Sequence, residues 1–350
     1  MNENSDFYTL PDFIVEPDFA NLQSVLEKDL PSRPTLFEFF LNEPLYERLA
    51  GRPCPPAEDQ LKHLRWLLTA FTNAGYDYVT YQGSRLGFPK GDGELGGFRQ
   101  EGITCVHDRE SFNQYPWPDP DDYDYGVLER IEPDLPENAK VIVPGPGGVF
   151  ENAISLVGFE NLAVLMASDA ELVDDIFESI GSVLVRHYEL AARHDSVGAC
   201  IANDDWGFKT QTMVSPESLR RYVIPWHRRI VETIHAAGKP AILHSCGKLD
   251  RVYPDIISDI GYDAKHSYED AIQPVEEAYE ELHEDIAVLG GIDVDYVCRK
   301  QPGEIYERSR AMLERASDRG GYALGTGNSV PDYVPDEHYF AMITAALEAR

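Results

Sequence analysis

The sequence predicts an α/β fold, a (β/α)8 barrel, on three observations. Eight short apolar segments are spread along the chain, and most precede a segment with helical periodicity. Such alternation indicates a parallel sheet, and eight repeats fit a closed barrel better than an open sheet. The 350 residues leave room for a barrel of roughly 250 residues with additions.

The expected strands cover residues 34–40, 76–81, 140–145, 197–202, 240–247, 261–266, 286–290 and 321–324. Apolar periodicity predicts helices near residues 19–30, 57–74, 149–165, 169–194, 215–237, 272–282, 302–319 and 338–349. We expect an N-terminal helical extension (1–33) followed by a single barrel domain (34–350). Residues 83–136 form a long insertion after the second strand, and its aromatic residues favour an ordered lid.

The chain is strongly acidic, with 61 Asp and Glu against 30 Lys and Arg and a formal net charge of −31. Nucleic acid and anionic membranes are poor partners for such a surface. It fits either a salt-rich cytoplasm or a merely acidic protein. The polar N-terminus and the lack of a long apolar run predict a cytoplasmic protein. The five scattered cysteines favour free thiols or a metal ligand over a disulfide framework.

His244 and Cys246 stand at the end of an apolar segment and just before Gly247. Residues i and i+2 of an extended chain point to the same side, so the imidazole and the thiol can close on one metal ion. Zinc accepts both ligands, and catalytic zinc sites use three protein ligands and one open position. The alternative is a buried structural cysteine beside a hydrogen-bonded histidine.

Nearly every expected strand ends in a polar side chain, and in a barrel these ends share one rim. We therefore expect one pocket lined by Glu38, Asn42, Tyr81, Asp204, Asp205, Trp206, His244, Cys246, His266, Glu269, Asp293 and Asn328.

Asp204 and Asp205 are consecutive, so only one of them can face this pocket from an extended chain. That carboxylate is a candidate metal ligand, substrate anchor or general acid/base; the alternative is a helix cap or a solvated turn. Trp206 lines the pocket or belongs to the core. His227 and His235 are interpreted as structural.

Residues 145–348 carry a set of motifs that resembles the uroporphyrinogen decarboxylase superfamily, which also contains the cobalamin-linked methyltransferases. The motifs are Gly145-Pro-Gly-Gly, Gly158-Phe-Glu-Asn-Leu, Asp204-Asp205-Trp-Gly, Ser215-Pro-Glu, His235-Ala-Ala-Gly-Lys, His244-Ser-Cys-Gly, Gly290-Gly-Ile-Asp293 and Gly325-Thr-Gly-Asn-Ser-Val-Pro. Their order and spacing cover about two thirds of the chain. The resemblance implies a (β/α)8 barrel.

The resemblance leaves two activities open. Decarboxylases of the superfamily carry an arginine-rich N-terminal motif that holds the carboxylates of the substrate. The corresponding segment here, 37–46, has acidic residues and no arginine, which disfavours uroporphyrinogen as substrate. The methyltransferase branch uses a His-x-Cys pair and a later cysteine as zinc ligands. His244 and Cys246 match that pair, whereas Thr326 stands where the later cysteine is expected.

By this resemblance the leading hypothesis is a methyltransferase that moves a methyl group between a small methylated substrate or thiol and a corrinoid carried by a partner protein. Zinc would sit at His244 and Cys246, with a third ligand from Glu151, Asp205, Glu269 or Asp293. Asp205, His244 and Cys246 would be catalytic, and Glu151 joins the expected pocket residues as substrate-binding. The alternatives are a decarboxylase and a non-catalytic binding barrel, and family members are often dimers.

Overall fold

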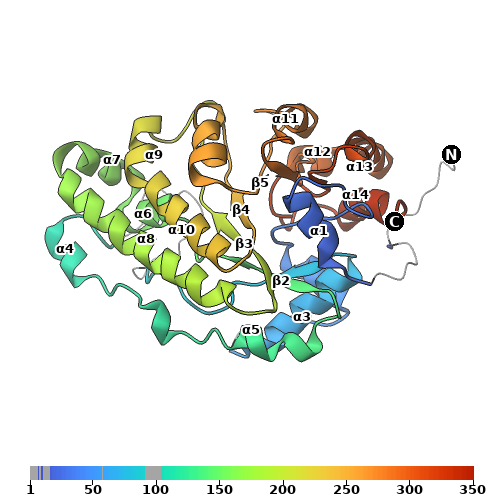
Figure 1. Ribbon diagram of the computed structural model, residues 1–350, viewed down its shortest axis with the longest axis horizontal. Helices are drawn as coiled ribbons and strands as arrows, with labels where there is room; N and C mark the ends of the chain where they lie inside the picture. The colour runs from blue at the N-terminus through green and yellow to red at the C-terminus, as the bar shows by residue number, and fades with distance from the viewer. Residues whose placement is uncertain (1–6, 8, 11–15, 57, 91–103) are drawn as a thin grey trace.

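The computed structural model describes residues 7, 9–10, 16–56, 58–90 and 104–350, and its centre is a curled, wholly parallel sheet (Figure 1). The seven strands follow one another in space in the order of the sequence. They are β1 (Tyr78–Thr80), β2 (Lys140–Pro144), β3 (Val197–Asn203), β4 (Ala241–His244), β5 (Ala264–His266), β6 (Ala287–Leu289) and β7 (Tyr322–Ala323).

The eight-stranded barrel predicted from the sequence is therefore seen in part. The segment expected as the first strand, 34–40, makes one parallel bridge, between Leu36 and Leu324 beside β7. On its other side the Tyr78 hydroxyl bonds the backbone N–H and C=O of Glu38, both at 2.7 Å. Between β1 and this segment, hydrogen bonds from the Tyr78 side chain thus replace strand-to-strand backbone hydrogen bonds. The segment therefore does not pair with β1 as a strand.

The sheet register aligns the ends of three neighbouring strands. Asn203 of β3 pairs with His244 of β4, and His244 pairs with His266 of β5. β3 and β4 are apolar up to their last residues and nearly all of their residues are buried, as a parallel sheet covered on both faces requires; β5 is buried too, although it contains Lys265 and His266. Polar side chains that follow these strands are therefore delivered to one edge of the sheet.

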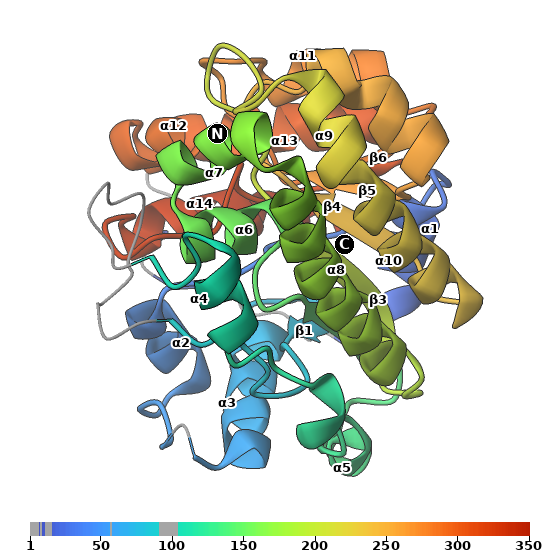
Figure 2. The same ribbon diagram turned by 90° about the vertical axis from the view of Figure 1, so that its left-hand side faces the viewer.

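Helices surround the sheet, and α8 and α10 run along its outside (Figures 1 and 2). Ser215 caps α9 by accepting a hydrogen bond from Ser218 N–H, as the Ser-Pro signal predicts. The helices after β2 are α6 (Val149–Val157), α7 (Phe159–Ser168), α8 (Ala170–Ala192), α9 (Pro216–Tyr222), α10 (Ile224–Ala236), α11 (Val275–Leu282), α12 (Val294–Arg299), α13 (Pro302–Ala316) and α14 (Asp336–Leu347), with short turns η3 (Asp250–Val252) and η4 (Asp255–Ile260).

The N-terminal part and the insertion are helical as well. Before β1 come α1 (Phe19–Leu26), α2 (Glu43–Ala50) and α3 (Gln60–Asn73). The described part of the insertion holds α4 (Arg109–Gln114), η1 (Pro120–Asp122), α5 (Val127–Arg130) and η2 (Glu132–Asp134). It runs along the outside of the molecule, where η1 contacts α8 and α5 contacts α3. Residues 91–103 of the expected lid lie outside the described residues.

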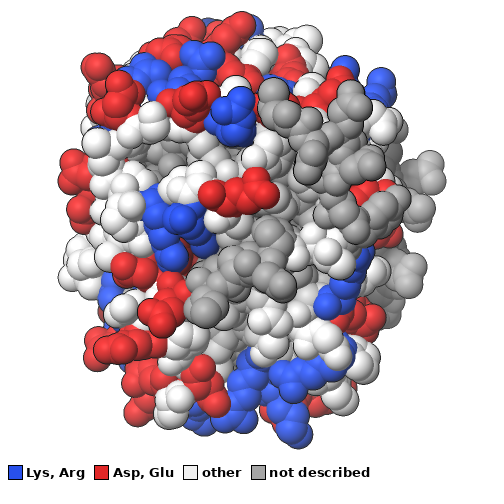
Figure 3. Space-filling view, turned by 90° about the vertical axis from the view of Figure 1, so that its right-hand side faces the viewer, with Lys and Arg blue, Asp and Glu red and all other residues white. Residues whose placement is uncertain are grey.

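The surface mixes both signs of charge. Figure 3 shows acidic side chains spread over one face, with basic side chains in small groups between them. In the described part of the chain, no single helix is long and apolar enough to cross a membrane; α6 and α7 pass the length and composition criteria only as a pair bent by 96°.

Candidate metal and active site

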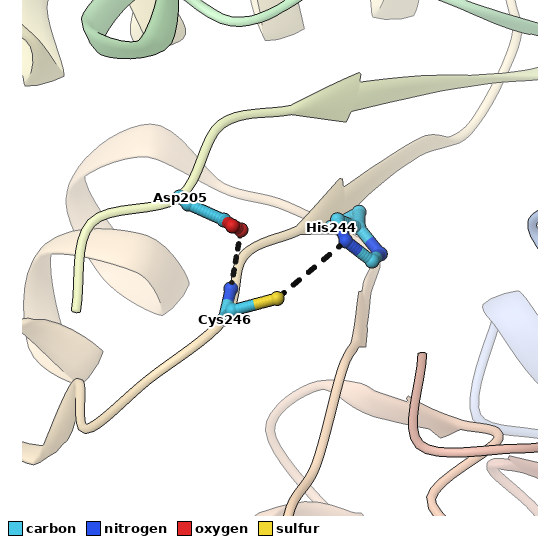
Figure 4. A group of neighbouring side chains, drawn as sticks. All are labelled: Asp205, His244 and Cys246. Carbon is cyan, nitrogen blue, oxygen red and sulfur yellow. Dashed lines mark hydrogen bonds between the residues drawn. The ribbon is translucent and has the colours of Figure 1, made fainter. Parts of the chain in front are cut away.

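Asp205, His244 and Cys246 meet at the carboxyl ends of β3 and β4 (Figure 4). The backbone N–H of Cys246 donates to Asp205 Oδ1 at 2.8 Å, and Cys246 Sγ lies 3.8 Å from His244 Nε2. One potential ligand atom from each residue falls within 4.8 Å of the other two. The structure therefore brings together the three residues that the sequence marked as catalytic.

The spacing of this cluster fits zinc. Bonds of about 2.3 Å to sulfur and about 2.0 Å to nitrogen at a tetrahedral angle separate the two ligand atoms by roughly 3.6 Å. The observed separation of Cys246 Sγ and His244 Nε2 is 3.8 Å. Imidazole, thiolate and carboxylate are all zinc ligands, and three of them leave the fourth position open for a substrate, as in catalytic sites.

The electrostatics of the cluster also suit a cation. Burial raises the pKa of the Cys246 thiol to about 12, and the neighbouring Asp205 carboxylate adds to the shift. Burial also raises the pKa of Asp205 and lowers that of His244 well below its ordinary value. A carboxyl group, a thiol and a neutral imidazole thus face one another in a site where His244 is buried and Asp205 and Cys246 are half-buried. A bound metal ion would reverse the shift at the thiol, since it stabilises the thiolate directly.

The sulfur of Cys246 has two further polar neighbours. Ser267 Oγ donates to it at 3.2 Å, and Asn328 Nδ2 donates at 3.3 Å. Asn328 was expected at this rim, whereas Ser267 was missed. Its backbone is left-handed, with φ of 86°, a conformation that a non-glycine residue rarely adopts and that nothing in the sequence marks. Both donors would stabilise negative charge on sulfur.

Asp204 turns away from this cluster and is fully buried. Its carboxylate accepts hydrogen bonds from the backbone N–H groups of Phe150 and Glu151, in the first turn of α6. It also accepts from Trp206 Nε1 at 2.9 Å and lies 2.8 Å from His227 Nε2. Of the two consecutive acids, Asp205 faces the candidate metal site and Asp204 ties α6 and α10 to the end of β3.

Trp206 and the histidines at positions 227, 235 and 266 have protein partners. Trp206 is buried and stacks edge-on against His227. His227 and His235, interpreted as structural, bond Tyr262 and Asp263 respectively. His266 is completely buried, with Nδ1 2.8 Å from His244 Nδ1. It therefore bonds the ring nitrogen of His244 that does not face Cys246.

The N-terminal residues of the expected pocket are engaged in local contacts. Glu38 is fully buried; it accepts from the N–H of Thr326 at 2.6 Å and shares a second hydrogen bond of 2.8 Å with the Thr326 hydroxyl, which also bonds the Asn328 carbonyl. Burial raises its pKa to about 8. Thr326, at the position expected for a third cysteine, therefore directs its hydroxyl to Glu38. Asn42 caps α2 through Leu45 N–H, and Tyr81 bonds Gln60 at 3.3 Å.

The other acidic candidates lie outside the cluster. Glu151 is half-buried and accepts from Gly148 N–H; burial, reinforced by Asp204 and Asp205, raises its pKa to about 8. Asp293 caps α12 through Tyr296 N–H at 2.9 Å. The described part of the chain contains one cluster with the geometry of a metal site, and Asp205 is the carboxylate in it.

Two cavities each include one of the residues that donate to the Cys246 sulfur, although none of the three cluster residues lines either cavity. One of about 950 Å³ lies at the ends of β5 to β7 and includes Asn328, and the other of about 370 Å³ includes Ser267. Both donors to the Cys246 sulfur thus line a cavity. The larger is lined by Lys209, Tyr268, Glu269, Asp270, Ala271, Asp293, Val294, Asp295, Tyr296, Cys298, Arg299, Lys300, Gly327, Asn328, Ser329, Pro331 and Tyr333.

The curled parallel sheet thus carries, at the carboxyl ends of its strands, a cluster of Asp205, His244 and Cys246 that could hold a metal ion. Residues 103–349 match the family model of uroporphyrinogen decarboxylase (URO-D). The chain belongs to this family, as the motifs predicted.

Two curated proteins with different activities are similar to part of this chain. A methylated-thiol–coenzyme M methyltransferase of Methanosarcina mazei is 27% identical over 191 residues, 54% of this chain and 49% of that protein. A uroporphyrinogen decarboxylase of Myxococcus xanthus is 27% identical over 179 residues, 50% and 48% of the two chains. The match thus spans about half the length of each curated relative.

Solved structures share the fold over nearly the whole chain. A methyltransferase from Methanosarcina mazei superposes with a TM-score of 0.69 at 14% identity, covering 96% of this chain and 99% of that one. A putative vitamin-B12-independent methionine synthase from Listeria monocytogenes gives a TM-score of 0.50 at 11% identity, covering 96% and 98%. At these identities the likeness concerns the fold alone.

Proposed function

We propose that the chain is a methyltransferase of the uroporphyrinogen decarboxylase family that holds zinc between His244, Cys246 and Asp205. One observation carries the proposal: three ligand atoms of the types zinc accepts lie within 4.8 Å of one another at the strand ends. Asp205 replaces the later cysteine expected from the resemblance, because the position of that cysteine holds Thr326, which bonds Glu38.

The residues of the chain would act on a small thiol or methylated molecule. Zinc, when bound, supplies a Lewis acid that lowers the pKa of a thiol acceptor. His244 contributes a neutral ligand, and Asp205 both completes the site and holds the Cys246 backbone. Ser267 and Asn328 donate to sulfur and line the cavities from which a substrate would approach. Glu151, with a raised pKa and beside Asp205, is the nearest candidate for a substrate contact.

A corrinoid on a separate protein is proposed to give the methyl group to the thiol or to take it from the methylated molecule. The 34–40 segment beside β7 is proposed to take the place of the eighth strand. Support comes from the family, from the motifs shared with cobalamin-linked members, and from a relative whose name joins a methylated thiol to coenzyme M. We also propose that the protein is a homodimer in the cytoplasm.

Metal analysis combined with a methyl-transfer assay tests this function. Purified protein should carry close to one zinc per chain and should demethylate free methylcobalamin in the presence of simple thiols. Cys246→Ser should lose both properties. Cys54→Ser is the matched control, because Cys54 lies between α2 and α3, outside the cluster and outside both cavities, and the change should leave both properties intact. Wild-type protein without zinc after growth in zinc-supplemented medium would overturn the metal assignment.

Uroporphyrinogen decarboxylation is the second candidate, favoured by the Myxococcus relative. The 37–46 segment opposes it, because this segment contains no arginine to hold a substrate rich in carboxylates. Incubation with uroporphyrinogen should yield no coproporphyrinogen; its formation would replace the methyltransferase proposal.

A further inference from the structure

We propose that His266 is a positioning residue that fixes the tautomer of His244 and so leaves His244 Nε2 free to bind metal. The inference rests on the proposed metal site, and it assigns to His266 a role other than the substrate contact expected from its place at the end of a strand. It is carried by a chain of hydrogen bonds from β4 through β5 to the residues after β7.

The direction of this chain follows from its far end. His266 Nε2 lies 3.2 Å from the carbonyl oxygen of Thr326, and a carbonyl only accepts hydrogen bonds. His266 Nε2 therefore carries the proton, and Nδ1 of the neutral ring is an acceptor. His244 Nδ1, 2.8 Å away, must then be the donor. The proton of His244 is thereby held on Nδ1, so its Nε2 lone pair faces Cys246 Sγ.

The carbonyl at the end of the chain is held in place by the backbone. Gly291 N–H donates to Thr326 O at 2.9 Å, which leaves the second lone pair for His266. Gly290 has φ of 68°, and a side chain there would place its Cβ 2.2 Å from Thr326 O and 3.0 Å from the His266 ring. Glycine at this position thus permits the close approach of ring and carbonyl.

The surroundings of His244 and His266 favour two neutral rings joined by a hydrogen bond, an arrangement called the relay below. Metal-bound histidines usually bond a carboxylate, carbonyl or water through the second nitrogen. Among the described residues, no carboxylate forms a hydrogen bond or ion pair with His244 or His266. The rings of Phe37 and Phe39 pack against His266 and His244, at 5.1 and 4.8 Å between centroids. A neutral histidine orients the ligand here without adding a third negative group to a buried site that already holds Cys246 and Asp205.

Two measurements test the relay. The first is nitrogen-15 NMR of the histidine rings in metal-free wild-type protein, where His244 should be protonated at Nδ1 and bare at Nε2. A proton on His244 Nε2 would overturn the proposal. Because this measurement needs no metal, it decides the relay even if the protein proves to bind no zinc, and that second result would refute only the proposed function.

The second measurement is Zn²⁺ affinity by competition with a chelator. His266→Phe removes the acceptor and should weaken binding about 10- to 100-fold. His266→Asn places an amide oxygen near the position of Nδ1 and should recover most of the affinity. His187→Phe is the matched control: His187 is also fully buried, between Tyr125 OH and the Pro144 carbonyl, and should bind zinc as wild type does. Equal affinity of His266→Phe and His187→Phe would contradict the relay.

Discussion

Asp205 and Cys246 face each other across neighbouring strands, with the Cys246 N–H donating to Asp205 Oδ1 at 2.8 Å. The strand register explains this contact. Asn203 is paired with His244, and Asp205 and Cys246 each follow their member of that pair by two positions. A carboxylate and a thiol 41 residues apart are thus placed side by side by the sheet. Together with His244 they form the candidate metal site.

The third ligand can be identified by comparing two aspartates. Asp205→Asn keeps the hydrogen bond to Cys246 N–H but loses the charge, so Zn²⁺ affinity should fall at least about tenfold, about 1.4 kcal/mol. Asp293→Asn changes a rival candidate that caps α12, and it should bind Zn²⁺ like wild type. Chelator competition measures both. Loss of affinity in Asp293→Asn alone would assign the ligand to Asp293.

Asp204 should prove to be important for stability rather than for metal binding. Asp204→Asn turns one acceptor into a donor that faces Trp206 Nε1 and His227 Nε2, so a buried network is broken. We expect the free energy of unfolding to fall by about 3–5 kcal/mol. Urea denaturation measures this loss. A stability within 1 kcal/mol of wild type, on the scale of about 1 kcal/mol for an ordinary hydrogen bond, would contradict the role given to Asp204.

Glu38 should make the protein less stable as the pH rises. Its pKa is raised from 4.5 to about 8 by burial, so between these values the folded state keeps a proton that the unfolded state releases. The free energy of unfolding should therefore decrease through this window, by up to about 1.4 kcal/mol per pH unit from this group.

Glu38→Gln tests that slope. An amide mimics the protonated carboxyl, since it can accept from Thr326 N–H and donate to the Thr326 hydroxyl. The variant should match wild type near pH 5 and exceed its stability near pH 8. Denaturant titrations at both pH values make the comparison. A constant difference between the two proteins across this range would show that Glu38 is ionised in the folded state.

A side chain at Gly247, the residue after Cys246, should reduce both stability and metal binding. Gly247 has φ of 87°, and a Cβ there would lie 2.1 Å from the backbone of Gly207. Gly247→Ala should therefore destabilise the protein and weaken Zn²⁺ binding by displacing Cys246. Gly238→Ala is the control, because Gly238 has φ of 71° but open space around it. It should cost only the backbone strain, about 1 kcal/mol, and leave metal binding intact.

A result in which the two alanine variants lose equal stability would assign the whole effect to backbone conformation. The close approach of the two loops would then contribute nothing. Thermal unfolding and Zn²⁺ competition on the same samples separate these possibilities.

The family and most of the elements were readable from the sequence alone, because they depend on local spacing. Apolar periodicity predicted α1, α3, α6 to α11, α13 and α14 but missed the short helices α2, α4, α5 and α12, and seven of the eight expected strands are present. The His244–Cys246 pair at i and i+2 predicted two ligands on one side of a strand. The strand expected at 34–40 is present only as one bridge to Leu324. Whether an apolar segment pairs as a strand depends on its neighbours in space, and here Tyr78 of β1 bonds the segment through its side chain.

Only the tertiary structure decided how the site is completed. Among the four acids proposed from the sequence as a third ligand, Asp205 is the one that joins His244 and Cys246. Ser267 and Asn328 bond the sulfur, and His266 bonds His244. These contacts join residues from 21 to 82 positions apart in the sequence. Strand register and packing set such distances. Local sequence therefore determined which groups stand at the strand ends, and the fold determined which of them meet.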